Sequence, residues 1–297
     1  MASLKEVKTR IASVNSTRKI TSAMKMVASS KLHHAQTAIE SMRPYEHQLS
    51  HIMSTFVGSM EGEIDTPYAI KREVKRVAIV FYTSNTSLCG AFNANVIKAF
   101  NHKVAAYREQ GIEIAKVYAL GKKATDAAQK AGFECKEDYS LLLDHPSYEK
   151  AAQVASELMT AYANAEIDHV DLIYHHFKSA GSQILTEETF LPIDLKGGEQ
   201  CSANASATQQ STEALDFIVE PSKEEIVSAL VPKSLHLKLF TALLDSLASE
   251  HAARVMAMQT ATDNADDLLR ELTLTYNKTR QQAITSELLD IAGGSMQ

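Results

Sequence analysis

The sequence predicts an α/β protein in which two long terminal helices pair as an antiparallel coiled coil and flank a central α/β domain. The first observation is that the 60 residues from Lys233 to Ala292 contain neither glycine nor proline. As one helix they would extend roughly 90 Å at about 1.5 Å per residue, whereas a typical globular helix has about three turns. The second is that apolar residues near the N-terminus follow the spacing of a coiled-coil seam. The third is that the pattern becomes strand-like near residue 74.

The N-terminal coiled-coil helix is expected over residues 1–58. It begins with a capping box, Ser3-x-x-Glu6, whose two side chains satisfy backbone N–H groups at the helix start. Pro44 removes a backbone donor and clashes one turn back, but the apolar pattern resumes after it and continues to Phe56. We therefore expect a kink at Pro44 and not the end of the helix.

The seam of this helix is predicted from apolar residues at intervals of three and four. Arg18 and Thr21 interrupt the pattern. We expect it to resume at Ile20, Met24 and Val27. The other predicted seam residues are Leu4, Val7, Ile11 and Val14 before the interruption, and Leu32, Ala35, Ile39 and Met42 after it.

The central domain is expected over residues 74–195, where strand and helix patterns alternate. Compact runs rich in Val and Ile, bounded by small residues, predict buried strands. The predicted strands cover 74–84 and 114–121, the helices cover 91–110, 122–132 and 147–166, and a hairpin turning at Ser-Ala-Gly-Ser covers 170–195. This alternation indicates a Rossmann-like α/β domain with a parallel or mixed sheet.

The C-terminal part consists of a linker and a second long helix. Residues 196–221 form a polar linker and foot segment without periodicity, and its last residues, DFIVEP, are a candidate strand. The C-terminal coiled-coil helix is expected over 222–293, starting with a second capping box, Ser222-x-x-Glu225, and bending near Pro232. Its heptad residues, several of them small enough to admit a close partner helix, are Met258, Ala261, Ala265, Leu268 and Leu272.

Composition excludes several classes of protein. The 297 residues are 45% hydrophobic and 22% charged, as in soluble globular proteins. Three scattered cysteines without a C-x-x-C motif indicate a reducing compartment and no disulfide framework. No apolar run reaches the ~18 residues of a spanning helix, and no signal-peptide core is present, so we expect membrane association only through a partner. The basic N-terminal helix carries charges on all sides without stacking aromatics, which argues against nucleic-acid binding.

No catalytic, cofactor or metal site is expected. The turn YTSNTSLCGAFNANV occupies the place of a phosphate-binding loop but has one glycine, Gly90, and no G-x-G-x-x-G. His169, Asp171 and His175 alternate along one strand, and without ligands from a second element we expect them at the surface. Cys89 is expected to be a packed small residue of the turn. A nucleotide-dependent enzyme and a self-associating coiled-coil scaffold stay open as alternatives.

Two clusters of polar residues interrupt the long helices. They are either the solvated faces of a free coiled coil or the contacts of a rod that surrounding subunits hold. The N-terminal cluster contains Lys25, Ser29, Ser30 and Lys31, and the C-terminal one contains Asn277, Thr279, Arg280, Gln281 and Gln282.

The two ends of the chain resemble the gamma subunit family of bacterial F-type ATP synthases. The similar segments are IASVNSTRKITSAMKMVASSKL, SEHAARVMAMQTATDNADDLLRELTLTYNKTRQQAITSELLDIAGG and the turn TSLCGAFNANV. The resemblance implies a non-catalytic central rotor shaft inside a ring of three alpha and three beta subunits, with the α/β domain bound to epsilon and standing on the membrane rotor ring. Such a shaft couples proton flow to ATP synthesis by driving the beta subunits through their conformations, and it regulates ATPase activity. No cofactor is implied.

The resemblance also implies roles for single residues. Contact with beta subunits is implied for Met24 and Lys25 on the N-terminal helix and for Arg280, Gln281, Thr285 and Glu287 on the C-terminal one. Contact with the rotor ring is implied for Phe217, Val219 and Glu220. The apolar tail LLDIAGG corresponds to the smooth upper shaft of the family.

One turn departs from the family pattern. Asn85, Thr86 and Ser87 stand where the family usually has Asp-Arg-Gly, which leaves the packing of that turn to be explained. The chain also lacks a regulatory cysteine-pair insertion and a transit peptide. These absences favour a bacterial enzyme, peripheral at the cytoplasmic face of the inner membrane.

Overall fold

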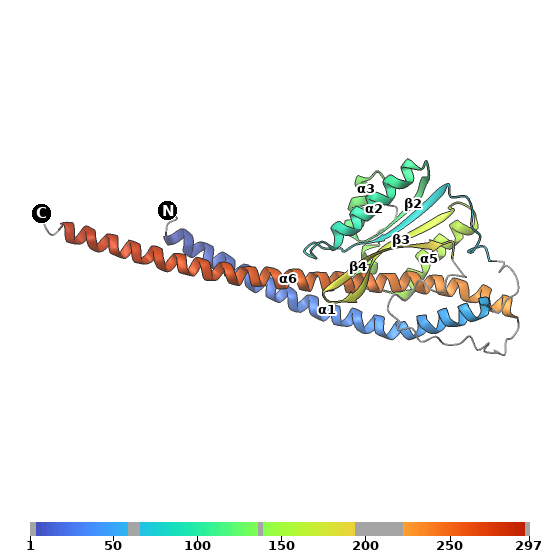
Figure 1. Ribbon diagram of the computed structural model, residues 1–297, viewed down its shortest axis with the longest axis horizontal. Coiled ribbons are helices and arrows are strands. Elements are labelled where there is room, and N and C mark those ends of the chain that lie inside the picture. The colour runs from blue at the N-terminus through green and yellow to red at the C-terminus, as the bar shows by residue number, and fades with distance from the viewer. Residues whose placement is uncertain (1–3, 59–65, 136–138, 194–221, 295–297) are drawn as a thin grey trace. The chain divides into compact units, whose positions relative to one another are not determined.

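The computed structural model of the chain describes residues 4–58, 66–135, 139–193 and 222–294 (Figure 1). The chain divides into two compact units. The coiled-coil unit combines the residues up to Ser30 with those from Arg254 onward, and the α/β unit runs from Lys31 to Ala253. Helix α1, Leu4–Gly58, and helix α6, Lys223–Gly294, each contribute to both units.

The coiled-coil unit contains the first part of α1 and the last part of α6, packed in opposite directions. Arg18 contacts Asp266, whereas Thr21, further along α1, contacts Thr262, which lies earlier on α6. The buried seam residues are Val7, Thr21 and Ala28 from α1 and Met258, Ala265 and Leu272 from α6. The predicted antiparallel pairing and the predicted heptad of α6 are therefore confirmed here.

The predicted course of the seam along α1 is wrong between Val14 and Ala28. Ile20, Met24 and Val27 are 59%, 40% and 60% exposed, so they lie outside the seam. The seam keeps its intervals of three and four through Arg18 and Thr21, because each of these polar side chains meets a polar partner on α6. Ala28, which is buried, then continues the seam.

Both long helices continue as expected and α6 also begins as expected, whereas Ser3 of the first capping box lies outside the described residues. At the start of α6 the backbone N–H of Glu225 donates to Ser222 Oγ over 3.2 Å, as in an N-cap. Pro44 lies inside α1 and Pro232 inside α6. Neither helix ends at its proline, which confirms that part of the prediction.

The α/β unit is built on a four-stranded mixed sheet of order β2-β1-β3-β4. Its strands are β1 Arg76–Tyr82, β2 Glu113–Leu120, β3 His169–Ser179 and β4 Ser182–Leu191. Strand β1 is parallel to β2 and β3, and β4 returns antiparallel beside β3. The predicted mixed sheet and the predicted hairpin are confirmed.

The shorter helices of this unit are α2 Phe92–Glu109, α3 Lys122–Lys130, α4 Ser140–Asp144 and α5 Tyr148–Ala163. Helix α4 was not expected, because five residues are too few to show a helical period. One face of the sheet forms a core with α2, in which the Phe81 and Phe100 rings stack with centroids 4.2 Å apart. Strand β1 is buried along nearly its whole length, as its continuous apolar sequence predicts.

Helix α6 packs on the same unit through its first half. Most side chains between residues 235 and 252 are buried. Tyr82 Oη donates to Leu239 O over 3.2 Å, and Lys238 Nζ donates to Thr189 O over 3.1 Å. Among the described residues α6 is also the one helix that is long and apolar enough, by length and composition alone, to cross a membrane, and 44% of that apolar stretch is buried.

The turn after β1 is joined to its neighbours through Asn85. Asn85 Nδ2 donates to Ser140 O over 2.8 Å, and Asn85 Oδ1 accepts from the Lys122 N–H over 3.2 Å. One side chain thus joins the turn to the starts of α3 and α4. Cys89 is buried, so its predicted role as a packed small residue is confirmed.

Candidate functional site

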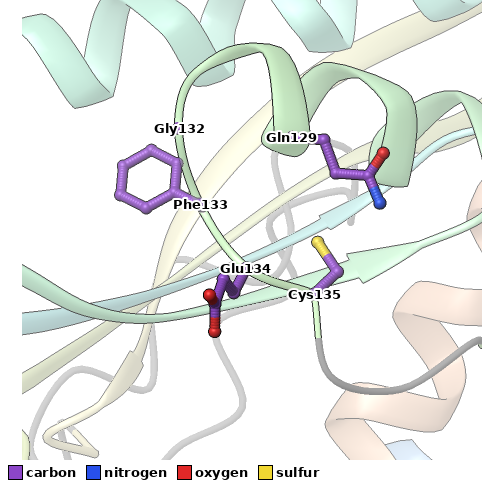
Figure 2. A pocket seen from close by; sticks show the side chains of 5 residues that line it. All are labelled: Gln129, Gly132, Phe133, Glu134 and Cys135. Atoms are coloured by element: carbon purple, nitrogen blue, oxygen red, sulfur yellow. The ribbon is translucent and has the colours of Figure 1, made fainter.

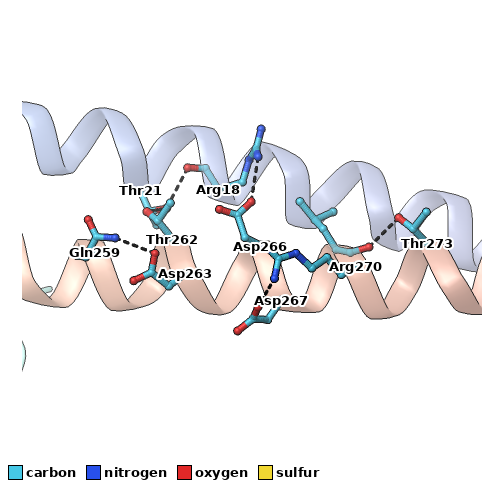
Figure 3. A network of polar contacts seen from close by, with 10 residues as sticks. Arg18, Thr21, Gln259, Thr262, Asp263, Asp266, Asp267, Arg270 and Thr273 are labelled. Atoms are coloured by element: carbon cyan, nitrogen blue, oxygen red, sulfur yellow. Dashed lines mark hydrogen bonds and ion pairs between the residues drawn. The ribbon is translucent and has the colours of Figure 1, made fainter.

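A polar layer crosses the seam of the coiled-coil unit (Figure 3). Arg18 Nη1 donates to Asp266 Oδ1 over 2.9 Å, and the hydroxyls of Thr21 and Thr262 lie 2.9 Å apart. The Thr262 hydroxyl also donates to Met258 O over 2.8 Å. Polar seam residues stabilise a coiled coil less than apolar ones but fix its register. The layer therefore specifies which level of α1 faces which level of α6.

We expect the Arg18–Asp266 pair to contribute about 0.5–1 kcal/mol, because both side chains are about 40% exposed and exposed ion pairs are weak. A double-mutant cycle with Arg18→Ala and Asp266→Ala, measured by urea unfolding of the full chain, gives this coupling free energy. The matched control is Arg270 with Asp267, 3.4 Å apart on one helix and more exposed. A coupling no larger than that of the control would show that the pair does not specify register.

The outer face of α1 in this unit carries exposed apolar side chains. Ile20, Met24 and Val27 follow one another at intervals of four and three, so they form one stripe along the helix surface. Met26, on an adjoining side, is 68% exposed. Contiguous exposed apolar surface is typical of sites where another protein binds. We call Ile20, Met24 and Val27 the α1 stripe.

The end of α6 is a second exposed surface. Leu4 lies 14 residues before Arg18, so in the antiparallel pair it faces α6 about 14 residues after Asp266, near residue 280. Beyond that level nearly every described side chain of α6 is exposed. The large apolar ones among them are Ile284, Leu288, Leu289 and Ile291. A solvated helix would not carry so many, so this end of α6 also has the character of a binding surface.

Apart from Lys25, the residues with implied roles fall on these two surfaces or outside the described residues. Met24 is exposed and Lys25 is half-buried on α1. Arg280, Gln281, Thr285 and Glu287 are all exposed on α6. Phe217, Val219 and Glu220 lie outside the described residues.

The structure does not bring the two groups together. Because the helices are antiparallel, Met24 lies at the level of about residue 259 on α6. Arg280 is about 20 residues, or roughly 30 Å, further along the helix. Ile20 and Val27 were missed as surface residues because they were assigned to the seam, and an unbroken heptad count would have found them.

The histidine and carboxylate cluster of β3 is not at the surface, and that expectation was wrong. Asp171 and His175 are each only 2% exposed. Asp171 accepts hydrogen bonds from Tyr107 Oη and, over 3.2 Å, from His169 Nε2, while Lys103 Nζ lies 3.2 Å away. Burial alone would raise the pKa of Asp171, but these donors hold that pKa below its usual value. Packing of α2 on this face explains the burial, which strand alternation alone could not predict.

His175 is enclosed separately. Its ring stacks on Phe92 with centroids 4.5 Å apart, and burial lowers its pKa to about 4. The ring is therefore neutral in the folded chain near neutral pH. Among the described residues, no group of three His, Cys, Asp or Glu side chains is placed to hold a metal ion.

A surface hollow of about 430 Å³ lies at the end of α3, lined by Gln129, Gly132, Phe133, Glu134 and Cys135 (Figure 2). The Cys135 sulfur points towards the Gln129 side, whereas the Glu134 carboxylate points the other way. Burial raises the pKa of the Cys135 thiol, which disfavours the reactive thiolate. The hollow therefore contains no activated nucleophile with a base.

Comparison with known proteins supports the family resemblance. A family model described as ATP synthase matches residues 3–296. The ATP synthase gamma chain of Bacteroides thetaiotaomicron is 57% identical over 299 residues, and that of Phocaeicola vulgatus is 54% identical over 296 residues. In both cases the match covers all of this chain and all of the relative.

Solved structures share the fold. The structure of the Euglena gracilis mitochondrial ATP synthase OSCP/F1/c-ring in rotational state 3 contains a chain that is similar with a TM-score of 0.63. The match covers 99% of this chain and 93% of that one at 20% identity. A chain of the Tetrahymena thermophila mitochondrial ATP synthase central stalk and c-ring matches with a TM-score of 0.53, covering 82% of this chain and 99% of that one at 24% identity.

Proposed function

Because the chain belongs to the ATP synthase gamma chain family, we propose that its coiled coil is the shaft that couples transmembrane proton flow to ATP synthesis. In this role it makes and breaks no bonds itself. It biases each catalytic beta subunit between conformations of different nucleotide affinity, and it thereby also regulates ATP hydrolysis. The single observation that carries the proposal is the full-length match to gamma chains of two bacteria.

The partners follow from this role. The shaft turns inside three alpha and three beta subunits, and the α/β unit binds the epsilon subunit and the membrane rotor ring. The solved structures that share the fold are described as F1 with a c-ring and as a central stalk with a c-ring, which supports these partners. Nucleic acid has no part in this role, and contact with the membrane is made through the partner subunits.

Two surfaces of the coiled coil are proposed to meet the beta subunits. Met24 belongs to the α1 stripe and Lys25 follows it, so this contact combines apolar area with one cation. At the end of α6 the contact is polar, through Arg280, Gln281, Thr285 and Glu287. All except the half-buried Lys25 are exposed, as a partner contact requires of the free chain.

The other assignments remain proposals based on the sequence. Phe217, Val219 and Glu220, within the linker and foot segment 196–221, are proposed to contact the rotor ring. The helix 1–58 and the α/β domain 74–195 are proposed to precede this segment, and the helix 222–293 is proposed to follow it. The chain is a subunit of a membrane-associated complex, and we propose the cytoplasmic face of the bacterial inner membrane as its place.

Reconstitution tests the proposal directly. The alpha and beta subunits of the same organism are mixed with and without this chain, separated by gel filtration and assayed for ATP hydrolysis. We expect one copy of the chain to co-elute with three alpha and three beta subunits and the activity to depend on it. A chain that elutes alone and leaves the activity unchanged would favour the self-associating scaffold, and binding of nucleotide to the chain alone would favour the enzyme.

Removing the proposed polar contact is expected to weaken coupling. In the double variant Arg280→Ala, Gln281→Ala, the rate of proton-driven ATP synthesis by the reconstituted complex should fall by at least tenfold. The reason is that one arginine hot spot contributes about 2 kcal/mol to the free energy of an interface. Truncation after Thr279 should weaken it further. The matched control replaces Glu271 and Thr275, which are exposed on the same helix but outside the proposed contact. Equal losses in the control and the Arg280 variant would contradict the assignment.

A further inference from the structure

We propose that His176 and Asp245 form a pH-sensitive latch that fastens the β3–β4 hairpin to α6. The latch is closed when the His176 ring carries its second proton and is weakened when that proton is lost. This inference concerns the stability of the α/β unit. It goes beyond the coupling role and does not depend on it.

The geometry joins two elements that are distant in the sequence. His176 Nδ1 on β3 lies 2.6 Å from Asp245 Oδ2 on α6. The Asp245 side chain is 7% exposed and the His176 side chain 45%, so a buried carboxylate has a partner that water can reach. Among the described residues, the other carboxylate oxygen, Asp245 Oδ1, has no hydrogen-bond partner. The charge of this carboxylate is therefore balanced chiefly by His176.

Taken together, the groups around His176 favour the protonated form of its ring. The hydrogen bond to Asp245 raises the pKa of His176 most, and its partial burial opposes this. From α1, Arg43 lowers that pKa and Glu46 raises it, each more weakly than Asp245. From β4 the register partner is the apolar Ile184, and on its own strand Tyr174 and Lys178 share its side of the sheet.

The neighbouring histidine shows why the latch is specific to one residue. His175 points to the opposite face of the sheet, is buried on Phe92 and stays neutral in the folded chain. Its backbone oxygen accepts a hydrogen bond from Ser249 Oγ over 3.2 Å. That bond ties β3 to α6 at every pH, because neither group titrates. Among the contacts described here between β3 and α6, the one made by His176 depends on the protonation of its ring.

The direction of the pH effect follows from the raised pKa. A base whose pKa is higher in the folded chain contributes stability that is complete below its unfolded pKa of about 6.5. The contribution is lost as the pH rises through the folded pKa. Above it, Asp245 remains a buried carboxylate beside a neutral imidazole. The contact then resembles a half-satisfied buried charge, which is costly.

Opening of the latch is expected to be local. Tyr82 Oη on Leu239 O and Lys238 Nζ on Thr189 O hold other parts of the sheet on α6, and neither bond involves His176 or Asp245. The part of the hairpin beyond His176, up to its turn at Ala180 and Gly181, depends on the latch most. Local opening of such a segment is measurable as amide hydrogen exchange.

Hydrogen exchange of the full chain tests the latch. Protection of residues 174–186 is compared at about pH 6 and about pH 8.5, after correction for the intrinsic exchange rate. In the wild type we expect protection to fall at the higher pH by roughly tenfold for each pKa unit by which folding raises the His176 pKa. In His176→Lys the fall should disappear, because an ammonium keeps its charge over this range. In His176→Gln protection should be low at both pH values.

A second histidine of the same unit provides the matched control. His236 lies on α6, and its Nε2 is 2.9 Å from Ser156 Oγ, with no carboxylate partner in the part of the chain that the structure describes. Its pKa is lowered by burial, so His236→Gln should leave the loss of protection at high pH unchanged.

The proton itself can be followed by NMR of the His176 ring in the full chain. Its pKa should lie above about 6.5 in the wild type and return towards that value in Asp245→Asn. A His176 pKa at or below about 6.5 in the wild type, or the same loss of protection in His176→Gln as in the wild type, would overturn the proposal. The NMR measurement needs no variant, so misfolding of a variant cannot obscure the outcome.

Discussion

Replacing Gly121 with alanine is expected to lower the free energy of unfolding of the full chain by about 3 kcal/mol or more. Gly121 has φ 111°, and a Cβ there would lie 2.5 Å from Thr83 O and 2.8 Å from Leu143 Cδ1. Thr83 cannot move away freely, because its N–H donates to Leu120 O over 2.9 Å at the end of the sheet. Backbone strain and overpacking therefore act together. Urea unfolding of the full chain measures the loss.

A substitution at Gly132 distinguishes backbone strain from overpacking. Its φ is 90°, but none of the described residues has an atom within 4 Å of the position of an added Cβ. Gly132→Ala should therefore cost only about 1 kcal/mol for the left-handed backbone. If both variants lost the same stability, the close approach at Gly121 would not be the cause.

Asp171→Ala is expected to be the second most damaging change, at about 3 kcal/mol. Removing the carboxylate leaves Lys103, His169 and Tyr107 without the acceptor that they share, and breaking a buried charged pair is costly. Asp126, paired with Lys123 over 3.6 Å at the surface, is the matched control, and Asp126→Ala should change stability by less than about 0.5 kcal/mol. Thermal unfolding near neutral pH compares the two.

The same carboxylate makes the stability of the folded chain fall at acidic pH. The pKa of Asp171 is lower in the folded chain, so its contribution is present above the unfolded pKa of about 3.9 and is lost as the pH falls through the folded value. His175 acts earlier in an acid titration, because its folded pKa is about 4. Its neutral ring begins to cost stability as the pH falls below about 6.5. Asp171→Asn should remove the loss of stability that protonation of Asp171 causes and leave the loss that protonation of His175 causes.

Elements whose signal lies within their own residues were predictable from the sequence. Strand β1 is a run of apolar residues buried almost throughout, and the heptad of α6 from Met258 to Leu272 packs where it was expected. The hairpin of β3 and β4 is marked by the small residues of its turn. In each case a local pattern is sufficient, because burial repeats with the period of the element.

The errors arose where a partner decides the outcome. Arg18 and Thr21 remain in the seam because Asp266 and Thr262 face them, and no pattern within α1 contains that information. The burial of Asp171 likewise depends on α2, which supplies Lys103 and Tyr107. The residues proposed to contact beta subunits came from resemblance, since exposed polar side chains have no period that marks their partner.

The polar layer of the seam also has a consequence for the fidelity of assembly. If two newly made chains paired α1 with α1 in parallel and in register, Arg18 would face a second Arg18, and a pair of α6 helices would bring two Asp266 carboxylates together. Pairing within one chain joins the opposite charges over 2.9 Å instead. Like charges that meet in a wrong pairing add to the specificity that the contacts of the correct pairing provide. The polar layer should therefore favour pairing of α1 with α6 over pairing of two identical helices.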